Sequence, residues 1–146
     1  MAHRKLSHEG TLVLDCEGLS KFVSDHEPVV ALVAEARKRG MEVVLSALTI
    51  IEAVHSRTDK ARLAWALSGM RIVPIGDEEA KAASAMLIGA GLHGHKYAID
   101  AAVAEMALRQ RRPVVMLTSD VDDMAKLCGD RVRLVAVNGL GIGKRR

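Results

Sequence analysis

The sequence predicts an α/β fold in three layers, with a central, mostly parallel sheet of four to five strands flanked by helices. Its short apolar runs are continuous rather than alternating, which is typical of strands buried on both faces. Segments with helical spacing of apolar residues separate these runs, and such alternation connects parallel strands through right-handed crossovers. Because the 146 residues contain no repeat or linker, they are predicted to form a single domain, 1–146, with flexible ends at 1–10 and 139–146.

The predicted elements follow the chain in order. Gly40 is suited to end the first long helix, and Ser46 is suited to cap the next one. Strands are predicted at residues 12–15, 42–45, 114–118 and 132–137, with a weaker strand at 71–75. Helices are predicted at residues 27–39, 46–55, 59–68, 77–90, 97–110 and 120–127.

Composition narrows the class of protein. Aromatic residues make up 2% of the chain, which argues against a base-stacking nucleic-acid module, because such modules need exposed rings. The net charge of +3 favours an acidic partner such as nucleic acid without requiring one. Cys16 and Cys128 lack metal-ligand spacing and are predicted to be buried, reduced thiols. No stretch has the length of a membrane span or the character of a signal peptide, so the sequence predicts a cytoplasmic protein.

Two predicted strands lead into an aspartate at the same edge of the sheet. Asp15 ends the run TLVLD, and Asp120 follows VVMLTS and opens the helical segment VDDMAKL. The carboxyl ends of parallel strands are where α/β domains bind ligands. Each aspartate alone is equally compatible with a helix N-cap, but capping explains two such positions at one edge less readily.

Glu52 and Asp100 lie within apolar helical segments. In LSALTIIEAVH, Leu48 and Ile51 mark the predicted buried face, and Glu52 lies at its margin. A carboxylate there costs free energy unless it is paired or binds a metal, the alternative being that it extends into solvent. Asp100, in YAIDAAVAEMAL, is compatible with the same role and with a first-turn aspartate that the helix dipole stabilises.

Together, the four carboxylates of Asp15, Glu52, Asp100 and Asp120 predict an acidic cluster. Mutual repulsion raises the pKa values of such groups until a cation or a basic partner neutralises them. Oxygen-only ligands suit Mg²⁺ or Mn²⁺, whereas zinc is disfavoured because the histidines show no ligand spacing. The cluster is therefore a candidate metal and catalytic site.

Four motifs, taken in order, resemble those of PIN domains, and among these the VapC toxins of bacterial toxin–antitoxin pairs. LVLDCEGLSKF matches the family's first strand with its aspartate, and VLSALTIIEAVH matches the helix with a buried glutamate. YAIDAAVAEMAL matches the aspartate that opens an alanine-rich helix. VVMLTSDVDDM, with Thr118, Asp120 and Asp123, matches a strand followed by Thr-x-Asp. The resemblance covers residues 11–137 and implies a PIN-like fold in which the four carboxylates form the active site.

Two features depart from the family pattern. Glu17 stands where many members have Ser, Thr or Asn, and it is either an additional ligand or an acid of the helix start that points away. Members often carry a second acid just before the third aspartate, where this chain has Tyr97 and Ile99. Glu105 points elsewhere on the same helix. Because the four main carboxylates are present, the resemblance still favours an active enzyme.

The resemblance implies an Mg²⁺- or Mn²⁺-dependent ribonuclease that cleaves single-stranded or loop RNA. The three aspartates would hold the metal, and Glu52 would complete its surroundings or orient a water molecule. Thr118 and Ser119 are candidates for contacting the phosphate or a ligand carboxylate, although Thr118 fits a structural strand-end hydroxyl equally well. Asp123 and Glu17 are secondary candidates for the site.

Basic residues near the cluster are expected, because carboxylates alone would repel RNA. Arg57, Lys60 and Arg62 follow the helix of Glu52 and are the candidates for binding RNA. The alternative is that they belong to an ordinary solvated helix face.

The resemblance also implies a homodimer and a cognate VapB-like antitoxin that places a basic side chain in the acidic pocket. Residues 46–68, with Leu63, Trp65 and Leu67, are a candidate groove for such a peptide. Internal packing of Trp65 is the preferred alternative for that residue.

Other function classes fit the sequence less well. A phosphatase of the haloacid-dehalogenase type needs Asp-x-Asp at the first strand, where this chain has DCE. A receiver domain needs paired acids near the first strand and a phosphorylatable aspartate at the end of the third, and this pattern is not found in the sequence. A nucleotide-binding fold needs a glycine-rich loop after the first strand, where this chain has Gly18 alone. The main alternative is a PIN-fold module that binds RNA or protein without catalysis, which an absence of metal binding would identify.

Overall fold

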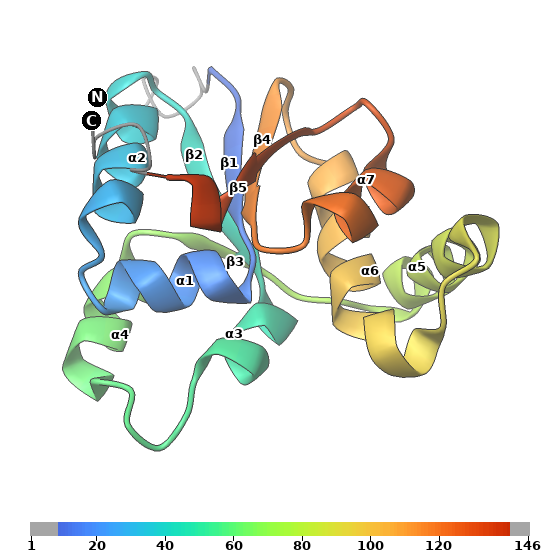
Figure 1. Ribbon diagram of the computed structural model, residues 1–146, viewed down its shortest axis with the longest axis horizontal. Helices are drawn as coiled ribbons and strands as arrows, with labels where there is room; N and C mark the ends of the chain where they lie inside the picture. Colours follow the sequence, from blue (N-terminus) through green and yellow to red (C-terminus); the bar gives the residue numbers. More distant parts are fainter. Residues whose placement is uncertain (1–8, 141–146) are drawn as a thin grey trace.

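The computed structural model describes residues 9–140 and contains a parallel sheet with the strand order β3-β2-β1-β4-β5 (Figure 1). β1 is central, and its Val13 lies opposite Val44 of β2 and Met116 of β4. The outer pairs, β2 with β3 and β4 with β5, are also parallel. The strands are β1 (Thr11–Leu14), β2 (Glu42–Ser46), β3 (Arg71–Val73), β4 (Val114–Thr118) and β5 (Arg133–Ala136).

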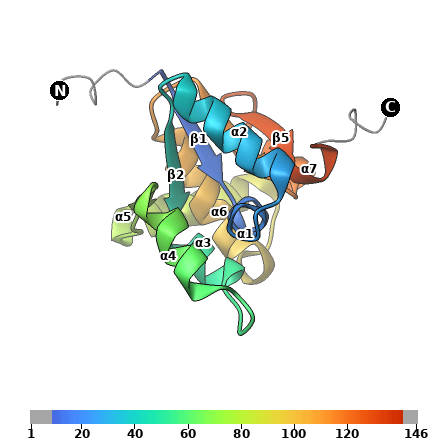
Figure 2. The same ribbon diagram turned by 90° about the vertical axis from the view of Figure 1, so that its left-hand side faces the viewer.

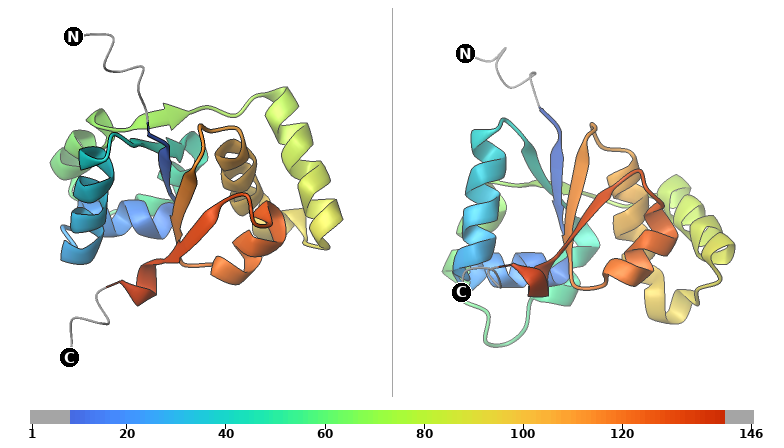
Figure 3. Two further views of the ribbon diagram at one scale, coloured as in Figure 1. Left: turned by 90° about the horizontal axis from the view of Figure 1, so that it is seen from above. Right: turned by 45° about the horizontal axis from the view of Figure 1, so that its top comes forward.

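Helices cover both faces of this sheet. The helices are α1 (Cys16–Val23), α2 (Glu27–Lys38), α3 (Ala47–Ala53), α4 (Lys60–Ser68), α5 (Asp77–Ala90), α6 (Gly94–Leu108) and α7 (Val121–Cys128). α1, α2 and α4 lie on one side, and α5, α6 and α7 on the other (Figure 3). Figure 2 shows α2 in front of β1 and β2 on the first of these sides. The short α3 lies at the carboxyl end of the sheet, against α1 and α6. The predicted three-layer arrangement is confirmed.

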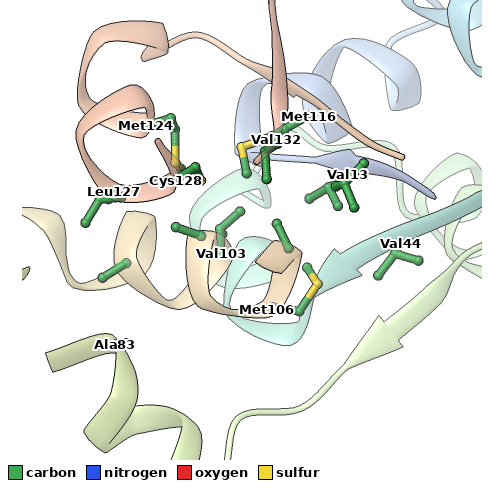
Figure 4. Close-up of a cluster of buried hydrophobic side chains, with 14 of the residues drawn as sticks. Val13, Val44, Ala83, Val103, Met106, Met116, Met124, Leu127, Cys128 and Val132 are labelled. Carbon is green, nitrogen blue, oxygen red and sulfur yellow. The ribbon is translucent and has the colours of Figure 1, made fainter. Parts of the chain in front are cut away.

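The strands divide their side chains between two hydrophobic clusters, one on each face. Leu12 and Leu14 of β1 pack with residues of α1 and α2, whereas Val13 packs with residues of α6 and α7. Figure 4 shows Val13 on the same side of the sheet as Val103 of α6 and Met124 of α7. Because both faces of each central strand are buried, the strands read as continuous apolar runs in the sequence.

Several element ends differ from the prediction. β5 is shorter than residues 132–137, because Val137 begins a 3-10 turn, η2 (Val137–Gly139). α6 begins at Gly94 and is kinked at Tyr97, where the sequence predicts its start. Residues 1–8 and 141–146, most of the predicted flexible ends, lie outside the described residues. Among residues 9–140, no helix combines the length and apolarity that crossing a membrane requires.

Candidate functional site

The carboxylate of Asp15 is buried where β1 ends and α1 begins. Its Oδ1 accepts a hydrogen bond of 3.0 Å from the backbone N–H of Gly18, so Asp15 does cap α1. Its Oδ2 accepts a second hydrogen bond, of 3.1 Å, from the backbone N–H of Ser119 in the turn after β4. Asp15 therefore does more than cap a helix, because it joins the carboxyl ends of the two central strands β1 and β4.

The turn after β4 presents a second carboxylate beside the first. Thr118 is fully buried, and its Oγ1 accepts a hydrogen bond of 3.0 Å from the N–H of Asp120, which is the structural role considered for it. Asp120 is exposed and occupies the N-cap position of α7, but its side chain makes no capping hydrogen bond. Ser119 is exposed as well. Capping therefore does not account for Asp120, whose carboxylate faces solvent at the sheet edge that holds Asp15.

The buried face predicted for the helix of Glu52 is wrong. Glu52 is exposed, Ile51 is 70% exposed, and the fully buried residue of α3 is Thr49. α3 has seven residues and lies at the end of the sheet between α1 and α6, so its neighbours rather than its apolar pattern decide which side is covered. Because Glu52 is exposed, the free-energy cost of burying a carboxylate does not support its assignment to the site. The assignment rests instead on the position of Glu52 beside other carboxylates.

Asp100 is where the carboxylates converge. It is half-buried on α6, and burial raises its pKa to about 6, with further increases from the negative charges of Asp120, Glu52, Asp15 and Asp123, in that order. It is the third residue after the kink at Tyr97, where α6 joins two helical segments, so it lies in the first turn of the second segment, as the helix-dipole alternative supposes. The charges of the other three sequence-predicted carboxylates, Asp15, Glu52 and Asp120, therefore act on this residue.

The two secondary acids differ in their relation to this cluster. Asp123 of α7 is half-buried and contributes to the raised pKa of Asp100, while its Oδ1 lies 3.9 Å from Nζ of Lys126. Glu17 pairs with Lys21 at 3.8 Å and is not among the charges that raise the pKa of Asp100. Asp123 therefore joins the cluster, and Glu17 lies at its rim.

Cys16 is a neighbour of the cluster that sequence reasoning missed. It is half-buried rather than buried, and its pKa is raised to about 12, first by burial and then by the charges of Asp15, Glu52 and Glu17 and a hydrogen bond to Glu52. The thiol is therefore protonated at neutral pH and is a weak nucleophile. Its position directly after Asp15 is the signal in the sequence that places it here. Cys128 is buried, as predicted.

The carboxylates suit a hard divalent cation in kind, because every candidate ligand atom is a carboxylate oxygen. Within residues 9–140, no three His, Cys, Asp or Glu side chains stand close enough together to hold a metal ion as they are. The charges act on Asp100 across longer distances, as expected of groups that repel one another. Glu52 and Asp120 are exposed, and the donor set fits a hard cation by the chemistry of its carboxylate oxygens.

A cavity of about 440 Å³ lies between α1, the segment after α3 and the start of α4, and Arg57 and Arg62 both line it. Arg62 is bound internally, since its Nε donates to the carbonyl oxygen of Val23 at 2.7 Å and its Nη2 lies 3.6 Å from Oδ1 of Asp25. Lys60 is exposed at the start of α4. Arg57 and Lys60 are the better placed of the three predicted RNA-binding residues, and Arg62 links α1 to α4.

The preferred interpretation of Trp65, internal packing, is wrong. Its side chain is 59% exposed and stacks on the ring of Phe22, with the ring centroids 5.7 Å apart. α4 buries only Ala66 fully, because it is a short helix at the edge of its layer. Leu63 lines the 440 Å³ cavity, whereas Trp65 and Leu67 do not. The predicted groove of residues 46–68 is therefore narrower and includes α1.

Comparison with known proteins bears on the fold. No protein-family model and no curated protein sequence matches the chain. Among solved structures, it is similar to VapBC2 from Rickettsia felis, bound to a DNA fragment from their promoter. The TM-score is 0.65 at 13% sequence identity, over 86% of this chain and 98% of that chain. The fold is PIN-like. At this identity the likeness concerns the fold alone, and it confirms the fold predicted from the four motifs.

The raised pKa of Asp100 leads to a testable pH dependence. Between about pH 4 and pH 6, folded Asp100 keeps a proton that the unfolded chain, with a carboxyl pKa of 3.8, has released. The free energy of unfolding therefore falls as pH rises through this window and levels off above it.

Asp100→Asn removes that loss. Without divalent metal, we expect the free energy of unfolding of this variant to exceed that of wild type by about 1–2 kcal/mol at pH 7, a value reduced for partial solvent screening. At pH 4 the two should be equal. Urea denaturation in EDTA at both pH values measures this, and a gain that is the same at both would contradict it.

Proposed function

We propose that this protein is an Mg²⁺- or Mn²⁺-dependent endoribonuclease and the toxin of a VapBC-type toxin–antitoxin pair. The observation that carries the proposal is the raised pKa of Asp100 at the carboxyl end of the central strands. Burial and four neighbouring carboxylates raise this pKa to about 6. Like charges gathered in a folded protein cost free energy, and their retention is typical of sites that bind a cation. The structural likeness to VapBC2 supports the choice of class.

Some residues of the site would hold the cation, and others would position the RNA substrate. The N–H groups of Gly18 and Ser119 fix the orientation of the Asp15 carboxylate. A bound Mg²⁺ or Mn²⁺ would supply positive charge that activates water and offsets the charge of the scissile phosphate. Asp100, whose pKa is about 6 without a metal, is mostly ionised at neutral pH and would help to hold the cation. Arg57 would attract the RNA backbone from the neighbouring cavity.

The proposed antitoxin would bind along the 440 Å³ cavity. Leu19, Val23 and Leu63 give it an apolar floor, and Arg57 and Asp59 give it charges of both signs. Such a site suits a peptide with alternating apolar and charged side chains. Because the cavity reaches Ala53, next to Glu52, a basic side chain of the peptide would come close to the carboxylates. Loss of RNA cleavage on addition of the purified antitoxin, with recovery on Leu63→Glu, is the outcome that this placement requires.

We include a homodimer in the proposal on the basis of exposed apolar side chains. Ile51 of α3 is 70% exposed and Ile88 of α5 is 79% exposed, and these side chains are candidates for a contact between two copies of the chain. Light scattering on the purified protein tests this part of the proposal, and a monomer at every concentration would remove it without touching the nuclease assignment.

The experiment that tests the proposal is cleavage of a total RNA pool by the purified chain, freed of any antitoxin. With millimolar Mg²⁺ or Mn²⁺ we expect discrete fragments, and in EDTA we expect intact RNA, because the cluster needs a cation to work. Isothermal titration of the protein with Mn²⁺ separates binding from activity. Metal binding without cleavage would favour the non-catalytic PIN-fold module. Absence of both metal binding and RNA cleavage would overturn the metal site. The test is needed because, within residues 9–140, no three candidate ligand side chains lie close enough together to hold a metal ion.

A further inference from the structure

Four arginines lie at the end of the sheet opposite the carboxylates. Arg111 and Arg112 belong to the segment between α6 and β4, and Arg131 and Arg133 lie at the start of β5. Arg112, Arg131 and Arg133 line one open cavity of about 550 Å³, together with Pro113, Val114 and Asp130. Figure 1 shows the two connecting segments side by side at the upper edge of the sheet, while the turns that follow β1 and β4 are at the lower edge. These four residues are called the arginine patch below.

The arginine patch carries unbalanced positive charge. All four side chains are exposed, and Asp130 is the one acidic residue that lines the cavity. Among the described residues, four other arginines have carboxylate partners: Arg39 with Glu35, Arg62 with Asp25, Arg71 with Glu42, and Arg109 with Glu105. Within residues 9–140, none of the four arginines of the patch forms a salt bridge. Among the described residues that line the cavity, three positive charges against one negative charge make this surface attractive to a polyanion.

The segment that carries Arg111 and Arg112 is held in place by the start of β1. The N–H of Thr11 donates to the carbonyl oxygen of Pro113 at 3.0 Å, and its hydroxyl donates to that of Arg111 at 2.9 Å. Gly10 permits this close approach, because its φ is 126° and a Cβ at this position would lie 2.5 Å from the Pro113 oxygen. The backbone of the patch is thus fixed before any ligand arrives, which reduces the entropic cost of binding.

We propose that the arginine patch binds single-stranded RNA at a distance from the bond to be cleaved. Guanidinium groups pair with phosphates in a bidentate way and stack on unpaired bases. The patch is formed by connecting segments, so it offers no helix or ribbon that could enter a duplex groove. Its affinity for a polyanion stands on its own charges, and the choice of RNA rests on the proposed function.

The two ends of β4 explain why a ribonuclease would need this patch. The five residues of β4, about 13 Å from the first Cα to the last, lie between the patch and the turn of Asp120. At that turn the cluster of carboxylates repels phosphates, and nearby Lys21 and Lys126 are engaged with Glu17 and Asp123. The patch would therefore add electrostatic attraction for RNA away from the cleavage point, beyond that of Arg57.

Fluorescence anisotropy with a labelled single-stranded RNA of about twenty nucleotides tests the proposal, in EDTA so that no cleavage occurs. The full chain is compared with a double variant, Arg112→Ala with Arg131→Ala. We expect the double variant to bind about tenfold more weakly near physiological salt, because each phosphate contact adds about 0.7 to the slope of log affinity against log salt. Loss of two contacts should lower that slope by about 1.4.

The matched control is Lys81→Glu, which changes the net charge by the same two units on the exposed, remote α5. It should bind RNA as wild type does, and thermal denaturation should show all three proteins folded. Equal affinity of wild type and the double variant would overturn the patch, as would an equal loss in Lys81→Glu. Tighter binding of duplex DNA of the same sequence would overturn the choice of RNA. Because binding is measured without metal, failure of RNA cleavage would refute the proposed function and leave the RNA affinity of the patch to be judged by its own result.

Discussion

Asp100→Asn is expected to slow metal-dependent RNA cleavage by about two to three orders of magnitude. Asparagine has nearly the same size and shape, so the packing of α6 is retained. It cannot carry the negative charge that the Asp100 carboxylate would contribute to the cation site. The loss should appear in the initial rate at low RNA concentration with saturating Mg²⁺ or Mn²⁺, which reports kcat/KM. RNA affinity in EDTA should remain near that of wild type, since the substituted group binds no phosphate.

Asp122→Asn is the matched control for this prediction. Asp122 is an exposed acid in the first turn of α7, close in sequence to Asp120 and Asp123, but it is not among the charges that raise the pKa of Asp100. Its removal should change the cleavage rate by no more than about twofold. The assignment of Asp100 is refuted if Asp100→Asn cleaves as fast as wild type while cleavage still requires metal. Equal losses in the two variants would point to general charge effects instead of a site.

Leu117→Ala is expected to lower the free energy of unfolding by about 3 kcal/mol. Leu117 is fully buried in β4, in the cluster shared with α1 and α2, and its side chain lies against Gly18 at the start of α1. Its carbonyl oxygen accepts the hydrogen bond from the N–H of Asp15 at 3.1 Å. Truncation leaves a cavity beneath the turn that positions Asp15, so stability is lost at the base of the site. Urea denaturation followed by circular dichroism measures the change.

Ile88→Ala serves as the comparison, since it also removes a large aliphatic side chain. Ile88 is 79% exposed on α5, and its replacement should alter the free energy of unfolding by less than about 0.5 kcal/mol in the monomer. A similar destabilisation by both substitutions at low protein concentration would show that the assigned core is wrong. A loss by Ile88→Ala that grows with protein concentration would instead reveal the proposed dimer.

Much of the fold could be predicted because it depends on local pattern. Continuous apolar runs at residues 12–15, 42–45 and 114–118 identify strands buried on both faces, and these correspond closely to β1, β2 and β4. Parallel pairing then brings the ends of β1 and β4 to one edge, so Asp15 and Asp120 were expected there. Short or edge elements were less predictable, because β5 passes directly into η2 and α6 begins before the kink at Tyr97.

The candidate site shows where local pattern stops being informative. The apolar residues around Glu52 predict a buried face through Ile51, yet Thr49 is buried and Ile51 is exposed. Trp65 is the largest side chain of the chain and was expected inside, yet it stacks on Phe22 at the surface. In both cases the helix is short, with seven residues in α3 and nine in α4, so contacts with neighbouring helices decide its orientation.

The sequence by itself determined the class of fold, the central strands and the edge of the sheet at which Asp15 and Asp120 lie, whereas the site of four carboxylates stays a prediction. These follow from periodicity and strand ends, which are properties of a few adjacent residues. Only the tertiary structure decided that Asp100 is half-buried, that Cys16 lies near Asp15 and Glu52, and that Arg112 and Arg131 share one cavity at the far end. Each of these depends on segments distant in the chain being brought together, and burial and charge act through space rather than along the sequence.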